Sequence, residues 1–269
     1  MKIANRPIGP EAPCYVVAEI GLNHNGSVDL ARQLIQAAHE AGADAVKFQT
    51  RTIEVVYSPE ELAKPRASPW GTTNGDQKRG LEFDRDAYAE IDLACRARGI
   101  AWFASPWDVA SVEFLASFDV PCYKVASACL TDHELLHAIR RTGKPVICST
   151  GMSSEVEIAA AYDLFSWSGP PPALLVTTST YPAALADLHL ARIPVMRSRY
   201  PASVIGYSSH SISPWPALSA VAMGASIVEA HLTLDRTMYG SDQAASLEPA
   251  AFKKLVTEIR DFEVARGSG

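Results

Sequence analysis

The sequence predicts an α/β protein with a (β/α)8 TIM barrel fold and a short N-terminal hairpin-like extension. Short apolar runs alternate with helical segments eight times over about 250 residues, which is a usual length for such a barrel. The runs are apolar almost throughout, as expected for parallel strands that are buried on both faces. A doubly wound open sheet is the alternative, but the first strand-to-helix turn, G-L-N-H-N-G, lacks the G-x-G-x-x-G spacing of a dinucleotide site.

The N-terminal third contains the least regular part of the chain. Residues 2–9 predict a small hairpin, with a turn at 7–10, that closes one end of the domain. Ser27 can cap a helix over 28–41, which keeps helical spacing of its apolar residues and ends at Gly42. Residues 51–84 contain several prolines and glycines and no clear period, so they predict a long loop over the barrel mouth.

The remaining strands and helices follow each other in a regular order. The predicted strands are residues 15–20, 44–50, 101–105, 122–126, 145–149, 173–178, 204–208 and 226–230. The predicted helices after them are residues 28–41, 85–98, 108–117, 132–142, 153–166, 187–197, 214–223 and 249–266. We therefore interpret residues 1–269 as a single barrel domain that is catalytic.

Composition narrows the class of protein. The 269 residues are 48% hydrophobic and 20% charged, as in a soluble globular domain. The net charge of −6, without a basic stripe, disfavours nucleic-acid binding. Five cysteines without a C-x-x-C pair indicate reduced thiols, and the chain has neither a signal core nor an apolar run near the roughly 18 residues of a membrane span. We expect a cytoplasmic protein.

Polar side chains collect where the predicted strands end, and in a barrel the active site lies at these carboxyl ends. The residues there include Glu19, Lys47, Gln49, Ser105, Lys124, Ser127, Ser149, Ser179, Tyr181, Ser208, His210, Glu229 and His231. A charged side chain within an apolar strand is costly unless it has a partner. Lys47 and Lys124 are therefore expected to face an anion in the barrel mouth, with a structural ion pair to Glu19 or Glu229 as the alternative.

Two histidines end neighbouring apolar runs in the stretch 205–231. Because parallel strands run in one direction, His210 and His231 should emerge at the same end of the sheet. Paired imidazoles suit a divalent metal, although two polar strand-end residues would have the same pattern. A metal, two lysines, several hydroxyls and the carboxylate of Glu19 suit a phosphorylated keto or enol substrate.

The chain resembles the sialic acid synthase family, which comprises phosphoenolpyruvate-dependent N-acetylneuraminate, legionaminate and pseudaminate synthases. Motifs that match in order and spacing are A-E-I-G-L-N-H-N-G (18–26), K-F-Q-T (47–50), K-V-A-S (124–127), S-T-G-M (149–152), Y-P (181–182), G-Y-S-S-H (206–210), E-A-H-L-T (229–233) and S-D-Q-A-A-S-L-E-P (241–249). The resemblance covers essentially the whole chain, and the joint match is far more specific than any single motif.

The resemblance implies a metal-dependent barrel that condenses phosphoenolpyruvate with an open-chain sugar aldehyde, releases phosphate and yields a 3-deoxy-2-keto sugar acid. It implies a homodimer and a metal, Mn²⁺ before Mg²⁺ or Co²⁺, on His210 and His231. The implied phosphoenolpyruvate contacts are Lys47, Ser105, Lys124, Ser127, Ser149 and Ser208. Gln49, Tyr181 and Asp242 match positions near the acceptor, and Glu19 is the implied acid or base.

Departures from the family pattern fall mainly where the acceptor is expected. Cys129, Ser179, Ser209 and Gln243 replace the family's usual Glu, Asn, Asp and His. The family usually continues into a C-terminal antifreeze-like domain that supplies an arginine across a dimer. We expect this chain to lack that domain, either because it is naturally absent or because the chain was truncated. We therefore expect the same reaction on a different aldehyde. The alternatives are a pyruvate aldolase with a Schiff base on Lys124 or Lys47, and a non-catalytic barrel that binds a sugar acid.

Overall fold

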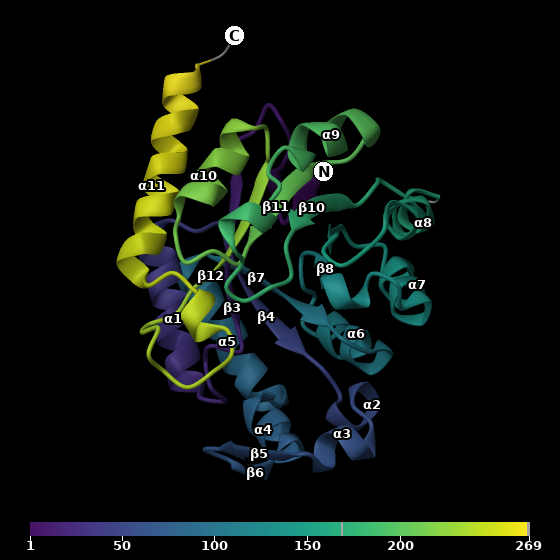
Figure 1. The fold of residues 1–269 in the computed structure, drawn as a ribbon, viewed down its shortest axis with the longest axis vertical. Helices are drawn as coiled ribbons and strands as arrows, with labels where there is room; N and C mark the ends of the chain where they lie inside the picture. The colour runs from purple at the N-terminus through teal and green to yellow at the C-terminus, as the bar shows by residue number, and fades with distance from the viewer. Residues whose placement is uncertain (168, 268–269) are drawn as a thin grey trace.

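A computed structural model describes residues 1–167 and 169–267. Its main sheet consists of eight parallel strands, namely β3 (Tyr15–Gly21), β4 (Ala45–Thr50), β7 (Ala101–Pro106), β8 (Tyr123–Val125), β9 (Val146–Ser149), β10 (Ala173–Thr177), β11 (Ile205–Ser209) and β12 (Ile227–His231). Hydrogen-bonded neighbours follow the order β7-β4-β3-β12-β11-β10-β9-β8, and the end strands β7 and β8 also contact each other. The sheet is therefore nearly closed, which confirms the predicted barrel (Figure 1).

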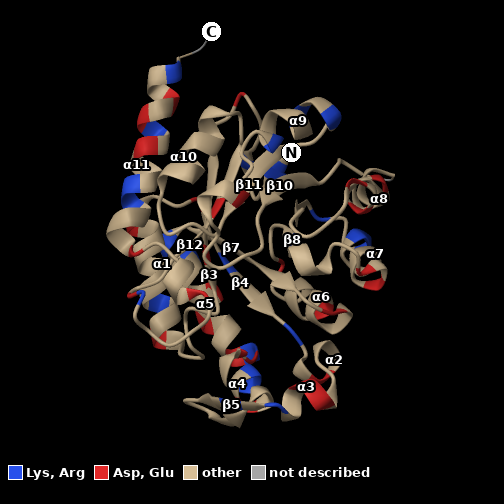
Figure 2. Cartoon of the chain, in the orientation of Figure 1, with Lys and Arg blue, Asp and Glu red and all other residues tan. Residues whose placement is uncertain are grey.

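Helices surround this sheet, and charged side chains lie along many of them (Figure 2). The main ones are α1 (Val28–Ala41), α5 (Arg85–Arg98), α6 (Val109–Ala116), α7 (His133–Arg141), α8 (Glu155–Ser166), α9 (Arg192–Arg199), α10 (Trp215–Ala222) and α11 (Pro249–Arg266). The helix predicted over 187–197 begins only at Arg192, because His189 has a left-handed φ of 44° that interrupts a helix. No helix in the described part of the chain is long and apolar enough to cross a membrane.

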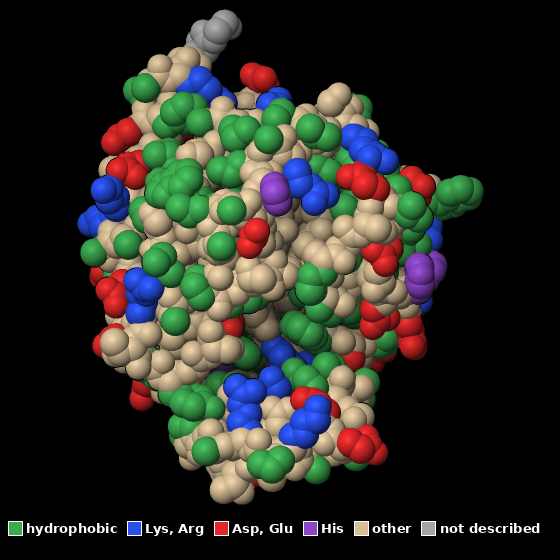
Figure 3. Space-filling view, viewed as in Figure 1, with side chains coloured by type: hydrophobic (Ala, Val, Ile, Leu, Met, Phe, Trp, Pro, Cys, Tyr) green, Lys and Arg blue, Asp and Glu red, His purple; other side chains and the backbone are tan. Residues whose placement is uncertain are grey.

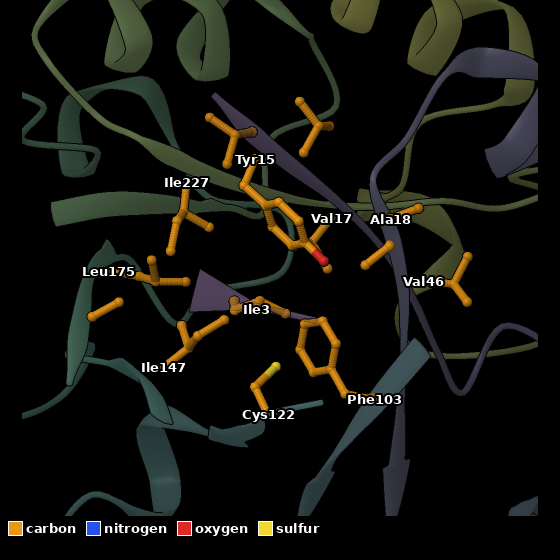
Figure 4. Packing of buried hydrophobic residues seen from close by; sticks show 14 of the residues in the cluster. Ile3, Tyr15, Val17, Ala18, Val46, Phe103, Cys122, Ile147, Leu175 and Ile227 are labelled. Atoms are coloured by element: carbon orange, nitrogen blue, oxygen red, sulfur yellow. The ribbon is translucent and has the colours of Figure 1, made fainter. Parts of the chain in front are cut away.

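The N-terminal hairpin closes the end of the barrel opposite the carboxyl ends of its strands. Strands β1 (Lys2–Ile3) and β2 (Arg6–Pro7) pair antiparallel, which confirms the hairpin. The turn of the hairpin lies between them, where Ala4 has a φ of 51°, and the turn predicted at 7–10 lies at residues 9–12, where Ala12 N–H donates to the backbone oxygen of Gly9. Ile3 is fully buried among side chains such as Tyr15 and Phe103 near the beginnings of the barrel strands (Figure 4). The extension therefore completes the core below the site.

The prediction of an unstructured loop over residues 51–84 is wrong. This segment forms α2 (Ile53–Val56), α3 (Pro59–Ala63), the hairpin β5 (Pro65–Ser68) and β6 (Gly71–Thr73), and α4 (Asn74–Leu81). These elements are too short to show a hydrophobic period, and local caps such as the Thr73–Asp76 capping box define their ends. Gln77 donates a hydrogen bond of 3.0 Å to the hydroxyl of Tyr239, so the segment packs on the loop that follows β12.

Gly206 in β11 marks a close approach that can be tested. A Cβ atom at this position would lie 2.6 Å from the backbone oxygen of Ile227 and 2.5 Å from Leu175 Cδ2. We expect Gly206→Ala to lower the free energy of unfolding by about 2 kcal/mol, because a packed strand cannot move away from the new atom. Urea unfolding measures the loss, and Gly9→Ala, where a Cβ meets nothing within 4 Å, is the matched control. Equal stability of the two variants would contradict this explanation.

Candidate active site

The carboxyl ends of the barrel strands enclose a cavity of about 190 Å³. Its lining includes the predicted residues Glu19, Lys47, Gln49, Ser105, Lys124, Ser127, Ser149, Ser179, Tyr181, Ser208, His210, Glu229 and His231. The face of the molecule shown in Figure 3 is hollowed between the barrel and the 51–84 segment, and Lys and Arg side chains gather beside that hollow. The structure therefore brings nearly all of the predicted site residues together.

Buried charges form the floor of this cavity. The Lys47 ammonium lies 3.2 Å from Glu19 Oε2 and 3.5 Å from Glu229 Oε1, and it donates a hydrogen bond of 3.1 Å to Ser105. The strand register explains the meeting, since Glu19 lies opposite Lys47 on β4 and opposite His231 on β12. The two interpretations of Lys47 are thus compatible, because it lines the cavity and also pairs with both glutamates.

The second lysine has a different environment. Lys124 donates hydrogen bonds to Ser149 Oγ at 2.7 Å and to the backbone oxygen of Val125 at 3.1 Å, and its ammonium lies 4.0 Å from Glu229 Oε2. Burial lowers the pKa of Lys124 to about 8, and the nearby Glu229 only partly opposes this change. Lys124 is therefore a cation that a modest rise in pH can neutralise.

The two glutamates are shifted in opposite directions. Burial raises the pKa of Glu19, and the attraction of Lys47 does not cancel that effect. Burial also acts on Glu229, but two lysines and a hydrogen bond of 3.1 Å from Ser208 outweigh it and lower the pKa of Glu229. Paired carboxyl groups with separated pKa values can divide the roles of proton carrier and fixed anion. This arrangement suits Glu19 for proton transfer and Glu229 for charge balance.

Hydroxyl groups converge beside Lys124, around Gly151. Ser127 Oγ accepts a hydrogen bond of 3.1 Å from the backbone N–H of Gly151, and Ser179 Oγ is buried without a partner. A Cβ at Gly151 would lie 2.3 Å from Ser179 Oγ and 2.9 Å from Ser127 Oγ, so only glycine admits both side chains. This role of Gly151 was not predicted from the sequence, although the residue lies in the S-T-G-M motif. Hydroxyls next to an ammonium suit a phosphate or carboxylate group.

The histidine pair lies on the other side of the cavity. The ring centres of His210 and His231 are 5.3 Å apart, and the ring of Tyr181 lies 4.0 Å from that of His210. Burial lowers the pKa of His210 to about 4, and its Nδ1 is hydrogen-bonded to the backbone oxygen of Thr178. The ring is then neutral at physiological pH, with its Nε2 left to accept.

The donor atoms can be tested for their fit to a metal. His231 Nδ1 is buried without a hydrogen-bond partner, and its nearest carboxylate oxygen is Asp242 Oδ2 at 3.9 Å. Within residues 1–167 and 169–267, no group of three or more His, Cys, Asp or Glu side chains is arranged to hold a metal ion. The residues therefore fit a divalent metal only as a pair of imidazoles whose remaining ligands would come from substrate or water.

Several residues that were predicted near the acceptor are absent from the cavity lining. Asp242 is absent from the cavity lining, although its carboxylate lies 3.9 Å from His231 Nδ1, and that carboxylate accepts a hydrogen bond from Ser241. Gln243 is fully buried. Its Oε1 accepts a hydrogen bond from the hydroxyl of Thr233, and its Nε2 donates one to the backbone oxygen of Asn23, so the side chain holds the loop in place. Among the four departures from the family pattern, only Ser179 lines this cavity.

Cys129 and His24 also lie outside the lining of the active-site cavity. Cys129 lines a neighbouring cavity of about 480 Å³, and Trp107 separates that cavity from the active-site cavity by lining both. His24 is buried, its ring stacks 3.9 Å from the ring of Phe83, and its Nδ1 accepts from the backbone of Gly26. Burial lowers the pKa of His24 to about 3, so this histidine is a neutral structural residue.

Comparisons with known proteins agree with the geometry. The sequence profile of the NeuB family matches residues 34–269. The chain is 38% identical over 265 residues to N-acetylneuraminate-9-phosphate synthase of Mus musculus, covering 98% of this chain and 74% of that protein. It is 34% identical to N,N'-diacetyllegionaminic acid synthase of Legionella pneumophila, covering 98% and 76%. The crystal structure of N-acetylneuraminic acid (sialic acid) synthetase from Leptospira borgpetersenii with citrate superimposes with a TM-score of 0.91 at 33% identity, over 100% and 90% of the chains.

Proposed function

The chain belongs to the NeuB family, and we propose that it condenses phosphoenolpyruvate with a sugar aldehyde to form a nonulosonate-type 3-deoxy-2-keto sugar acid, releasing phosphate. The names of its relatives support a synthase of sugar acids. The observation that carries the proposal is the cavity itself, where two buried lysines and several hydroxyls face two glutamates with opposite pKa shifts. A small, multiply charged anion beside a proton carrier is what this reaction requires.

The lysines and serines bind the enolpyruvate half. Lys47 and Lys124 attract the carboxylate and phosphate groups, and the hydroxyls of Ser127 and Ser179 donate to the remaining oxygens. Glu229 offsets part of the positive charge of the two lysines when no substrate is bound, since it lies within 4.0 Å of both ammonium groups. These contacts orient C3 of phosphoenolpyruvate toward the aldehyde.

Glu19 moves the proton at the reacting carbons. Because burial raises its pKa, protonated Glu19 can donate to the aldehyde oxygen while C3 of phosphoenolpyruvate bonds to the aldehyde carbon. The resulting carboxylate then accepts a proton from the water that adds at C2. Cleavage of the C2–O bond to phosphate then forms the C2 carbonyl, and the proton of the C2 hydroxyl leaves with the phosphate. Glu19 is left protonated, so atoms and charges balance. A divalent metal on His210 and His231, with Mn²⁺ the first candidate, would supply Lewis-acid polarisation of the aldehyde oxygen.

A direct assay tests this function. The protein is incubated with phosphoenolpyruvate, Mn²⁺ and a panel of N-acetylated, unmodified and phosphorylated aldoses, and phosphate release and product mass are measured. We expect release that depends on one class of aldose. Borohydride trapping of pyruvate on Lys124, whose lowered pKa suits an amine nucleophile, would instead support the aldolase. Sugar-acid binding without release from any acceptor would support the non-catalytic barrel.

The pH dependence of the reaction should report Lys124. Lys124 binds the anionic substrate only as a cation, and in the folded protein it loses its proton near pH 8 rather than near 10.5. The value of kcat/KM for phosphoenolpyruvate should therefore fall as pH rises through about 8, approaching tenfold per pH unit above it. Lys144→Met, which removes an exposed lysine paired with Asp119, should leave the profile unchanged. A flat profile between about pH 7 and 10 would contradict the role of Lys124.

A further inference from the structure

Arg51 is a buried cation directly behind the active-site cavity, and the mechanism above makes no use of it. Its side chain is 4% exposed, and it is absent from the cavity lining. Arg51 Nε lies 2.7 Å from Glu82 Oε1, and Nη1 donates a hydrogen bond of 3.1 Å to the hydroxyl of Tyr57. The guanidinium lies 4.6 Å from the ring centre of Trp107. The side chain is therefore held by the 51–84 segment on one side and by the cavity wall on the other.

Arg51 is also linked through Gln49 to Glu19, the proposed proton carrier. Arg51 Nη2 donates a hydrogen bond of 2.5 Å to Gln49 Oε1, and Gln49 Nε2 donates one of 3.0 Å to Glu19 Oε1. A guanidinium has only donors, so it cannot face the NH₂ end of an amide. The oxygen of Gln49 must then face Arg51, and its NH₂ group must face Glu19. Arg51 therefore fixes an amide orientation that would otherwise be free to reverse.

Little space surrounds the contact between Gln49 and Glu19. Gly21 has a φ of 52°, and a Cβ there would lie 3.0 Å from Glu19 Oε1 and 3.3 Å from Gln49 Nε2. Glycine at this position thus leaves room for the amide and the carboxyl group to meet. Since both Glu19 and Gln49 line the cavity, their relative position decides where the carboxyl group meets a ligand.

We propose that Arg51 is a positioning residue, which acts through Gln49 to aim the carboxyl group of Glu19 at the acceptor aldehyde. This inference rests on the proposed function, since it assigns Glu19 its role in that reaction. Without Arg51 the amide can reverse and turn its oxygen toward Glu19, which removes the N–H that now holds Glu19 Oε1 in place. The carboxyl group then loses a fixed direction, while the lysines that bind phosphoenolpyruvate are untouched.

A double-mutant cycle on the 269-residue chain tests the proposal. Arg51→Met and Gln49→Met should each lower kcat by about tenfold to a hundredfold, as expected when a reacting group is misplaced, with KM for phosphoenolpyruvate nearly unchanged. The double variant should lose no more than the more damaged single variant, because both act on one contact. Arg51→Lys should restore part of kcat, since an ammonium can still donate to Gln49. Arg79→Met, which breaks an exposed pair with Glu54 in the same segment, should leave kcat unchanged.

A second readout needs no turnover, so that failure of the proposed function can be told apart from failure of this inference. The Gln49 side-chain NH₂ resonances in a ¹⁵N spectrum are identified by their loss in Gln49→Met. We expect them to shift in Arg51→Met and to stay in place in Arg79→Met. Unchanged resonances in Arg51→Met would overturn the proposal, as would losses of kcat that multiply in the double variant. A wild-type protein that releases no phosphate from any aldose would instead overturn the proposed function alone.

Discussion

Replacing Lys47 with methionine is expected to lower kcat/KM by about a hundredfold to a thousandfold and the free energy of unfolding by roughly 3–5 kcal/mol. The change removes the cation that lies within 3.5 Å of both Glu19 and Glu229 and leaves two buried carboxyl groups without it. Binding of phosphoenolpyruvate suffers because one of the two ammonium groups in the cavity is lost. Phosphate release at varied phosphoenolpyruvate and urea unfolding measure the two effects separately.

The double variant Lys47→Met with Glu19→Gln distinguishes the two causes. It removes one of the stranded carboxyl groups, so stability should recover in part while activity should stay low. Lys144→Met breaks an exposed ion pair with Asp119 and should change stability by no more than about 0.5 kcal/mol. A Lys47→Met protein that unfolds like the wild type would show that the glutamates do not need this lysine.

The barrel could be predicted because its strands are apolar almost throughout and alternate regularly with helices. Helix α11 was predicted over the residues it occupies, since Pro249 at its first position and an amphipathic period define it. The 51–84 segment could not be predicted in the same way. Its helices and strands have three to eight residues each, and capping contacts hold them rather than a repeated apolar face. Such contacts are visible only when the chain is folded.

The site was predictable to the extent that strand register determines it. Parallel strands place their carboxyl ends at one edge of the sheet, so Glu19, Lys47 and His231 lie opposite one another on adjacent strands. Loop positions have no such rule. Gln243 was expected to face the acceptor but is buried in its own loop, and the side chain of Arg51, just past the end of β4, is held by Glu82 and Trp107. Packing between distant segments determines these positions.

Replacing His231 with alanine is expected to weaken Mn²⁺ binding by more than about a hundredfold and to reduce phosphate release to the level of the metal-free protein. Loss of a supporting contact around a metal costs tenfold to a hundredfold, and loss of a direct ligand should cost more. The expectation follows from the unpaired, buried Nδ1 of His231 and from the neutral ring of His210, 5.3 Å away. With only two imidazoles to hold an ion, neither can be spared. Electron paramagnetic resonance of free Mn²⁺ measures the affinity without an activity assay.

His24→Phe is the matched control, because it removes a buried histidine that stacks on Phe83 and keeps the stacking ring. Its Mn²⁺ affinity should equal that of the wild type, whereas His210→Ala should behave like His231→Ala. Turnover that survives exhaustive chelation, in a protein that binds no Mn²⁺ at millimolar concentration, would contradict a metal site on His210 and His231. The two imidazoles would then act only as hydrogen-bonding groups beside Tyr181, and the aldehyde oxygen would depend on Glu19 alone for its proton.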